Sequence, residues 1–266
     1  GTSTGGASNF TSGKIYRAQI YNGINGTLAA DFDPTRTTQA STSFAASTGE
    51  TWTINGRGFI YAAPVYLGYL AEEARTNLCL QSEDLNTTWG VTAATISTNA
   101  MTAPDGASTA DKIQEDATSA QHYARQSIVK AASAIQYSFT CWMKAAERGF
   151  GYLMIDDGGG ANYVLASWNL STGAVVVGPT TNGTFTGGAA SAAKAYPNGW
   201  WRCTIVGTTN TAVTVRPIIA PSVTGSDNFN YAGSAGSGIY AWGGQLEAGA
   251  FATSYIPTAA ATVTRA

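Results

Sequence analysis

Seven side chains in the middle and C-terminal parts of the chain are of the kinds that bind a carbohydrate. An aromatic ring stacks on the apolar face of a sugar ring, and polar groups beside it hydrogen-bond the hydroxyls. The alternation of the strands around them predicts that all seven share the face of a sheet that points away from the core. The predicted ligand-binding residues are Trp142, Lys144, Tyr152, Asp156, Arg202, Arg216 and Gln245. The cations among them favour an acidic polysaccharide, such as bacterial capsule or lipopolysaccharide.

A structural interpretation of the same residues stays open. In it, Trp142 and Tyr152 cover the second face of the sheet beneath a loop, and Arg202 forms an ion pair with Asp156. The two interpretations differ in one observable, because a ligand site needs an accessible hollow beside Trp142 or Arg202.

Two groups of carboxylates have the composition of a calcium site. Asp156 and Asp157 precede a turn of three glycines at positions 158–160. The second group is Asp105, Asp111, Glu115 and Asp116. Calcium takes six or more oxygen ligands, which neither group supplies alone, so solvated turns are the simpler interpretation. We predict no cofactor and no metal site, with a structural calcium ion as the open alternative.

No catalytic constellation is visible in the sequence. A retaining glycosidase needs two carboxylates about 5 Å apart, whereas neighbours such as Asp156 and Asp157 point to opposite faces of a strand. The single histidine, His122, has no nucleophile in a recognisable turn and is interpreted as half-buried. Three scattered cysteines, Cys79, Cys141 and Cys203, lack the spacing of a zinc site and are expected to be buried free thiols. We therefore predict that the protein is not an enzyme.

The composition excludes two classes of partner. Of 266 residues only 11% are charged, where about a quarter is usual, and the net charge is -2. No run of Lys and Arg offers a nucleic-acid footprint, and no apolar stretch approaches the roughly 20 residues that span a bilayer. The chain opens on a polar stretch, residues 1–6, without an initiator Met, so we expect it to be a piece of something longer.

Short β-branched and aromatic runs separated by turns predict an all-β protein. The one candidate helix lies within residues 67–80, where apolar residues recur at helical spacing. Four short strands are predicted before it, within residues 14–23, 28–32, 42–45 and 51–54. After it, eight are predicted, at residues 112–114, 122–129, 137–145, 151–156, 163–170, 200–207, 213–219 and 238–247. Eight strands at this spacing predict a jelly-roll β-sandwich.

The faces of these strands follow from their alternation. In residues 137–144 the apolar set includes Phe139 and Cys141, which leaves Trp142 on the other face. In residues 239–247 we assign Trp242 to the apolar set and Gln245 to the opposite one.

Several motifs resemble a C-terminal module that recurs in virion proteins of tailed phages. They are Glu73-Ala74-Arg75-Thr76-Asn77-Leu78, Gln81-Ser82-Glu83-Asp84-Leu85 with Trp89, Ala110-Asp111-Lys112-Ile113, Asn198-Gly199-Trp200-Trp201-Arg202-Cys203, Gly238-Ile239-Tyr240-Ala241-Trp242-Gly243-Gly244-Gln245-Leu246-Glu247 and Ser254-Tyr255-Ile256-Pro257-Thr258. The stretch 13–56 resembles the last strands of a concanavalin-like (laminin-G-type) lectin domain from the same proteins. The chain departs from the module's pattern at residues 232–235, where many relatives carry an acidic turn.

The resemblance implies three segments and a role on a phage particle. The segments are the end of a concanavalin/laminin-G-like β-domain (1–57), a connector with a short helix (58–80) and a carbohydrate-binding-like jelly roll (81–266). The implied role is adhesion: a fibre or spike component on the virion that binds host surface polysaccharide without catalysis. Partners would be other virion proteins and further copies of the chain, as a homotrimer or higher oligomer. A purely structural capsid decoration, collar or tail component is the alternative, and a polysaccharide depolymerase is a further one.

Overall fold

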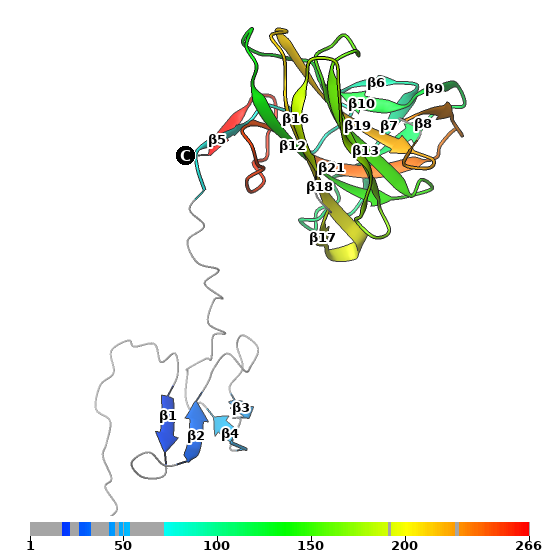
Figure 1. Cartoon of the computed structure of the whole chain (residues 1–266). Coiled ribbons are helices and arrows are strands. Elements are labelled where there is room, and N and C mark those ends of the chain that lie inside the picture. The colour runs from blue at the N-terminus through cyan, green and yellow to red at the C-terminus, as the bar shows by residue number, and fades with distance from the viewer. Residues whose placement is uncertain are drawn as a thin grey trace, which may run out of the picture. The chain divides into compact units, whose positions relative to one another are not determined.

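The computed structural model divides the chain into two compact units, residues 1–71 and 72–266. It describes residues 18–21, 27–32, 43–45, 48–49, 51–53, 72–190, 193–226 and 229–265. The first unit contains two described hairpins (Figure 1): β1 (Ala18–Tyr21) pairs antiparallel with β2 (Leu28–Phe32), and β3 (Ser43–Ala45) pairs with β4 (Thr51–Thr53). These are the four strands expected before residue 57.

The candidate helix is not formed where the structure describes it. Residues 67–71 of that prediction lie outside the described residues, and residues 72–80 contain strand β5 (Arg75–Asn77). This strand pairs with β22 (Val263–Arg265), near the end of the chain. The helical spacing of apolar residues is overridden because the backbone of this segment pairs with a distant strand.

The second unit is a β-sandwich of two seven-stranded antiparallel sheets, which we call sheet I and sheet II. Sheet I has the order β15-β14-β13-β19-β10-β6, with β11 also on β19, and sheet II has the order β16-β18-β12-β21-β8-β7, with β17 also on β18. Sheet I consists of β6 (Gly90–Thr92), β10 (Tyr123–Arg125), β11 (Ile128–Val129), β13 (Phe150–Asp156), β14 (Tyr163–Asn169), β15 (Val175–Asn182) and β19 (Thr214–Ser222). Sheet II consists of β7 (Ala94–Met101), β8 (Ala110–Glu115), β12 (Gln136–Ala145), β16 (Thr186–Ala190), β17 (Lys194–Tyr196), β18 (Trp200–Thr208) and β21 (Gly238–Ala248).

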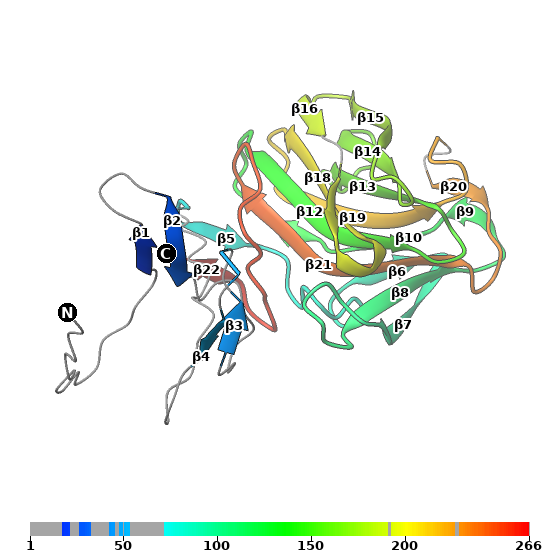
Figure 2. The same ribbon diagram turned by 90° about the horizontal axis from the view of Figure 1, so that it is seen from below.

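A two-stranded ribbon lies at one end of the sandwich. There β9 (Ser119–Gln121) pairs with β20 (Asn230–Ala232). Figure 2 shows this ribbon at the end opposite to β5 and β22. The all-β sandwich predicted from the sequence is confirmed, and one single-turn helix, η2 (Pro197–Gly199), precedes β18.

The main core lies between the two sheets and is built from one face of each strand. In β12 the core residues are Tyr137, Phe139, Cys141 and Met143, as the alternation predicts. Strand β13 faces it from sheet I, where a Cβ added to Gly151 would lie 2.8 Å from the Met143 sulfur. The outer faces of β12 and β13 therefore point to opposite sides of the molecule.

A bulge in β21 overturns the predicted face of Trp242, whereas the predicted outer face of Gln245 is correct. The pairing with β12 slips between Thr140, opposite Gln245, and Trp142, opposite Trp242. The extra residue falls at Gly243, whose φ of +71° suits glycine and whose added Cβ would lie 2.7 Å from the Trp142 ring. Trp242 consequently lies on the outer face together with Gln245.

The three cysteines are buried free thiols, as expected. Cys141 and Cys203 lie directly opposite one another on β12 and β18. Burial raises the pKa of the Cys141 thiol to about 12, and it also raises the pKa values of the other two. All three therefore remain protonated and act as small apolar residues. Among the described residues, no helix is long and apolar enough to cross a bilayer.

Candidate functional site

The seven residues predicted to form one ligand site lie on two different sheets. Trp142, Lys144, Arg202 and Gln245 belong to sheet II, whereas Tyr152, Asp156 and Arg216 belong to sheet I. The prediction that they share one face is wrong, because strand alternation identifies the outer face of each strand but not the sheet to which the strand belongs.

Trp142 is a packing residue on the outer face of sheet II. It is 3% exposed and makes edge-to-face contacts with Trp242, Tyr255 and Tyr196 at centroid distances of 5.2–5.4 Å. The guanidinium of Arg202 lies 4.7 Å from its ring centroid. These contacts cover the indole ring that was predicted to stack on a sugar.

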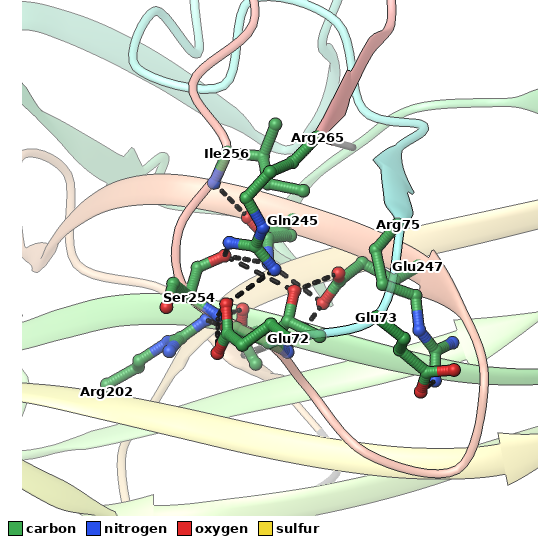
Figure 3. A network of polar contacts seen from close by, with 11 residues as sticks. Glu72, Glu73, Arg75, Arg202, Gln245, Glu247, Ser254, Ile256 and Arg265 are labelled. Carbon is green, nitrogen blue, oxygen red and sulfur yellow. Dashed lines mark hydrogen bonds and ion pairs between the residues drawn. The ribbon is translucent and has the colours of Figure 1, made fainter. Parts of the chain in front are cut away.

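Gln245 and Arg202 fasten the C-terminal segment to sheet II (Figure 3). The Gln245 amide is fully buried, accepts a hydrogen bond from the backbone N–H of Ile256 at 2.6 Å and donates to the Ser254 carbonyl. Arg202 donates to the Thr253 carbonyl at 2.7 Å. The network continues to Glu72, which accepts from the Ser254 N–H and pairs with Arg265. These groups are therefore structural, and the predicted ion pair between Arg202 and Asp156 is not formed.

Trp142→Phe is expected to lower the free energy of unfolding by about 1–2 kcal/mol while leaving any ligand binding on sheet I unchanged. The loss is modest because the indole N–H of Trp142 has no hydrogen-bond partner. Urea unfolding followed by tryptophan fluorescence measures it. A variant of wild-type stability that loses ligand binding would restore Trp142 as a contact residue.

A hollow of about 110 Å³ lies on the outer face of sheet I. Its floor is apolar and consists of Met154 on β13, Leu165 on β14 and Ile218 on β19, which lie side by side in the register. It is lined by Gln121, Tyr123, Met154, Asp156, Gly160, Tyr163, Leu165, Arg216, Ile218 and Phe229. Of the seven predicted ligand-binding residues, Asp156 and Arg216 line this hollow.

Asp156 and Arg216 form a two-pronged ion pair at the edge of this hollow. They are directly opposite on β13 and β19, and the Nε and Nη2 atoms of Arg216 each lie 2.5 Å from a carboxylate oxygen. Asp156 also accepts the N–H of Gly158 at 3.0 Å and is 1% exposed. The hydrogen bond from Arg216 to Asp156 raises the pKa of the guanidinium. Among the described residues that line the hollow, no other side chain is charged, so the net charge of this lining is zero.

Two half-buried tyrosines and a buried phenylalanine line the sides of the hollow. Tyr163 on β14 stands opposite Asp156, and Tyr123 lies on β10, three strands away from β14 in the order of sheet I. Phe229 contacts Tyr123 and Tyr152 edge to face at 6.0 and 5.5 Å. Tyr152 itself is fully buried, and its hydroxyl donates to the Gly225 carbonyl, so it supports the wall instead of facing a ligand.

Four residues that line the hollow were not predicted as ligand-binding: Gln121, Tyr123, Tyr163 and Phe229. Tyr163 carried a usable signal, because the glycine turn at 158–160 joins two adjacent strands and so places Tyr163 opposite Asp156. No sequence signal identified Phe229, since it lies between β19 and β20, outside the strands of sheet I.

The carboxylates of both calcium candidates are engaged within the chain. Asp157 accepts hydrogen bonds from the side-chain amides of Asn162 and Asn210 at 2.7 and 3.0 Å, and Asp111 accepts hydrogen bonds from the backbone N–H groups of Leu85 and Asn99.

A second hollow, of about 290 Å³, is lined by Glu83, Asp84, Asn86, Thr98, Asn99, Thr109 and Asp111. Burial raises the pKa values of Glu83 and Asp111 there. Among the described residues, no group of three or more His, Cys, Asp or Glu is placed to hold a metal ion.

No protein-family model and no curated protein sequence matches the chain. Among solved structures, the chain is similar to a structure titled as TmCBM61 in complex with β-1,4-galactotriose, at 12% sequence identity and a TM-score of 0.32. The match covers 60% of this chain and 88% of that chain. The likeness is distant, and the function proposed next rests on the hollow of sheet I.

Proposed function

We propose that the second unit is a non-catalytic binding module that holds one neutral sugar unit of a glycan in the hollow of sheet I. The observation that carries this proposal is the combination of an apolar floor, half-buried tyrosines and a fully paired Asp156–Arg216 couple in one accessible hollow. Tyrosine rings can stack on the apolar face of a sugar, and the unused N–H groups of Arg216 can donate to its hydroxyls.

The size and charge of the hollow restrict the class of ligand that it can bind. A hollow of about 110 Å³ is smaller than the roughly 300–1,000 Å³ of pockets that enclose a drug-sized molecule, so it holds a single ring at a time. Its zero net charge favours a neutral sugar, which revises the acidic polysaccharide expected from the sequence. An anionic sugar would bring its charge next to the carboxylate of Asp156.

The hollow is unsuited to glycosidic hydrolysis. Hydrolysis uses two carboxylates, either about 5–5.5 Å or about 6.5–9.5 Å apart. In the part of the chain that the structure describes, Asp156 is the one carboxylate that lines the hollow, and it is hydrogen-bonded by Arg216 and by the Gly158 N–H. We therefore propose binding without bond cleavage.

In its biological setting we propose an adhesion protein on the appendage of a tailed-phage particle, which binds host surface glycan as an oligomer. This part of the proposal is supported by the motifs that resemble phage virion modules. Because one small hollow gives weak affinity, several copies on a particle would be needed to hold a cell surface. The specific observation that favours the alternative, a purely structural virion component, is the sealed aromatic face of sheet II around Trp142.

A glycan array probed with the full chain tests the proposal, with neutral and uronate-containing oligosaccharides side by side. We expect binding to neutral glycans that Tyr163→Ala weakens about tenfold, which corresponds to about 1.4 kcal/mol of lost stacking. Tyr196→Ala is the matched control, since it removes the same ring from sheet II. Absence of binding to every glycan, or equal losses in both variants, would overturn the proposal.

A further inference from the structure

The single histidine of the chain lies directly beside the proposed sugar hollow. His122 joins β9 to β10 between Gln121 and Tyr123, both of which line the hollow. Its side chain is fully buried, and its backbone N–H donates to the carbonyl of Phe229 at 3.2 Å. The prediction of a half-buried histidine is therefore corrected to a fully buried one.

Both ring nitrogens of His122 face backbone carbonyl oxygens. Nδ1 lies 2.6 Å from the Ala93 oxygen, and Nε2 lies 3.2 Å from the Tyr231 oxygen. A carbonyl oxygen accepts hydrogen bonds and cannot donate one, whereas a neutral imidazole carries a single N–H. Only the doubly protonated imidazolium satisfies both contacts.

The charges around the ring suit an imidazolium. The Asp116 carboxylate lies 3.8 Å from Nδ1, and hydrogen bonds from Thr118, together with the charge of His122, lower the pKa of Asp116. The Tyr231 ring lies 4.8 Å away, and its hydroxyl donates to Glu115. Glu115 is in turn neutralised by Arg148. The nearest uncompensated charge facing His122 is thus the negative one on Asp116.

We propose that His122 acts as a positioning residue: in its imidazolium form it holds β20 and Phe229 against β9 and β10, and so keeps the wall of the hollow in place. The residues that it bridges belong to two segments far apart in the sequence, one at Ala93 and the other at Phe229 and Tyr231. The residues after β20 pack closely against His122, as shown by Gly233, where an added Cβ would lie 2.7 Å from a carbon of the His122 ring. The consequence for sugar binding, though not the bridge itself, rests on the function proposed above.

The sign of the pH dependence follows from the hydrogen bonds. The protonated ring makes both contacts, so its contribution is fully present at acid pH. When the pH rises and one proton leaves, the lone pair of one ring nitrogen faces a carbonyl oxygen, so that hydrogen bond is lost and replaced by a repulsive contact. The wall of the hollow therefore loosens toward alkaline pH, and sugar affinity falls with it.

Nitrogen NMR of the full chain labelled at histidine tests the bridge without any sugar, and a single histidine gives an unambiguous signal. At pH 5.5 we expect both ring nitrogens to carry protons. On deprotonation we expect amide exchange in β20 to rise about tenfold relative to β12, after correction for the intrinsic effect of pH. A neutral ring at pH 5.5, or unchanged relative exchange between pH 5.5 and 8, would overturn the inference.

Asp116→Asn separates positioning by charge from simple packing. Asparagine retains an oxygen that accepts the Thr118 N–H, so the turn persists while the charge is lost. We expect the variant to move the midpoint of the pH dependence of β20 exchange to lower pH, because the negative charge that favours the imidazolium is gone. Asp105→Asn is the matched control, because Asp105 makes the same kind of turn with Ala107. An unmoved midpoint in Asp116→Asn would contradict the role of the charge.

The same samples distinguish failure of the inference from failure of the proposed function. If the ring titrates and β20 responds, but the array shows no glycan bound at either pH, the bridge stands and the sugar-binding function falls. If glycans bind equally well at pH 5.5 and 8, the positioning role falls and the function stands.

Discussion

Glu115→Gln is expected to lower the free energy of unfolding by about 2–4 kcal/mol, the range for breaking a buried ion pair after allowance for the partly exposed Arg148. The Glu115 side chain is fully buried and Arg148 is 17% exposed. The carboxylate accepts from Arg148, from the Tyr231 hydroxyl at 2.5 Å and from the Ser234 N–H at 2.7 Å. Glutamine keeps one acceptor oxygen but turns an NH₂ group toward the guanidinium, which leaves Arg148 without its charge partner.

The pH dependence of this effect has a defined direction. Burial alone would raise the pKa of Glu115, but hydrogen bonds from Arg148, Tyr231 and Ser234 outweigh it, so the pKa lies below the ordinary value of 4.5. The carboxylate therefore stabilises the fold above pH 4.5, and its contribution is lost as the pH falls through the lowered pKa. Urea unfolding at pH 7 should separate wild type from Glu115→Gln, and the gap should narrow at strongly acid pH.

Glu147→Gln is the control for this prediction. Glu147 pairs with Lys112 but is 53% exposed, so its loss should change stability by less than about 1 kcal/mol. Equal losses of unfolding free energy in Glu115→Gln and Glu147→Gln would show that the buried ion pair of Glu115 contributes no more to stability than an exposed one.

The strands of the sandwich follow from the sequence wherever one face is apolar and the other is not. In β12 and β18 the apolar alternation places Cys141 and Cys203 in the core correctly, and the structure pairs them. Strands such as β15 and β17 were missed because they are largely exposed, and so they lack an apolar face that would show a period of two. The bulge at Gly243 made the predicted face of Trp242 wrong while that of Gln245 was correct, since a one-residue insertion breaks the alternation between the two sides of the bulge.

The candidate site could be predicted only in part, because alternation says nothing about what covers an outer face. Trp142 and Asp156 both lie on outer faces. The former is covered by Tyr196, Trp242 and Tyr255, whereas the latter borders a hollow. The side chains that cover Trp142, and the Phe229 wall of the hollow, come from segments far away in sequence. No local pattern around Trp142 or Asp156 contains that information.

Asp156→Asn is expected to reverse the charge preference of the hollow. It removes the carboxylate and leaves the Arg216 guanidinium, which is 14% exposed, as the single charged group among the described residues that line the hollow. A uronate carboxylate about 4 Å from a guanidinium gains at most about 4 kcal/mol near a protein surface, and solvent screening reduces this. We expect the ratio of uronate to neutral oligosaccharide affinity to rise about tenfold, which is about 1.4 kcal/mol.

The substitution also tests whether the hollow, and not the general charge of the protein, selects the ligand. Asparagine retains an acceptor oxygen for the Gly158 N–H, so the turn after β13 should persist. Asp157→Asn removes one negative charge from the neighbouring position, but its carboxylate contacts Asn162 and Asn210 and does not line the hollow. Because both variants change the net charge equally, a shift toward uronates in Asp156→Asn alone, measured by calorimetric titration with matched neutral and uronate oligosaccharides, would place the ligand beside Arg216. The same shift in both variants would mean that the ligand senses long-range charge, and the hollow on sheet I would then not be its binding site.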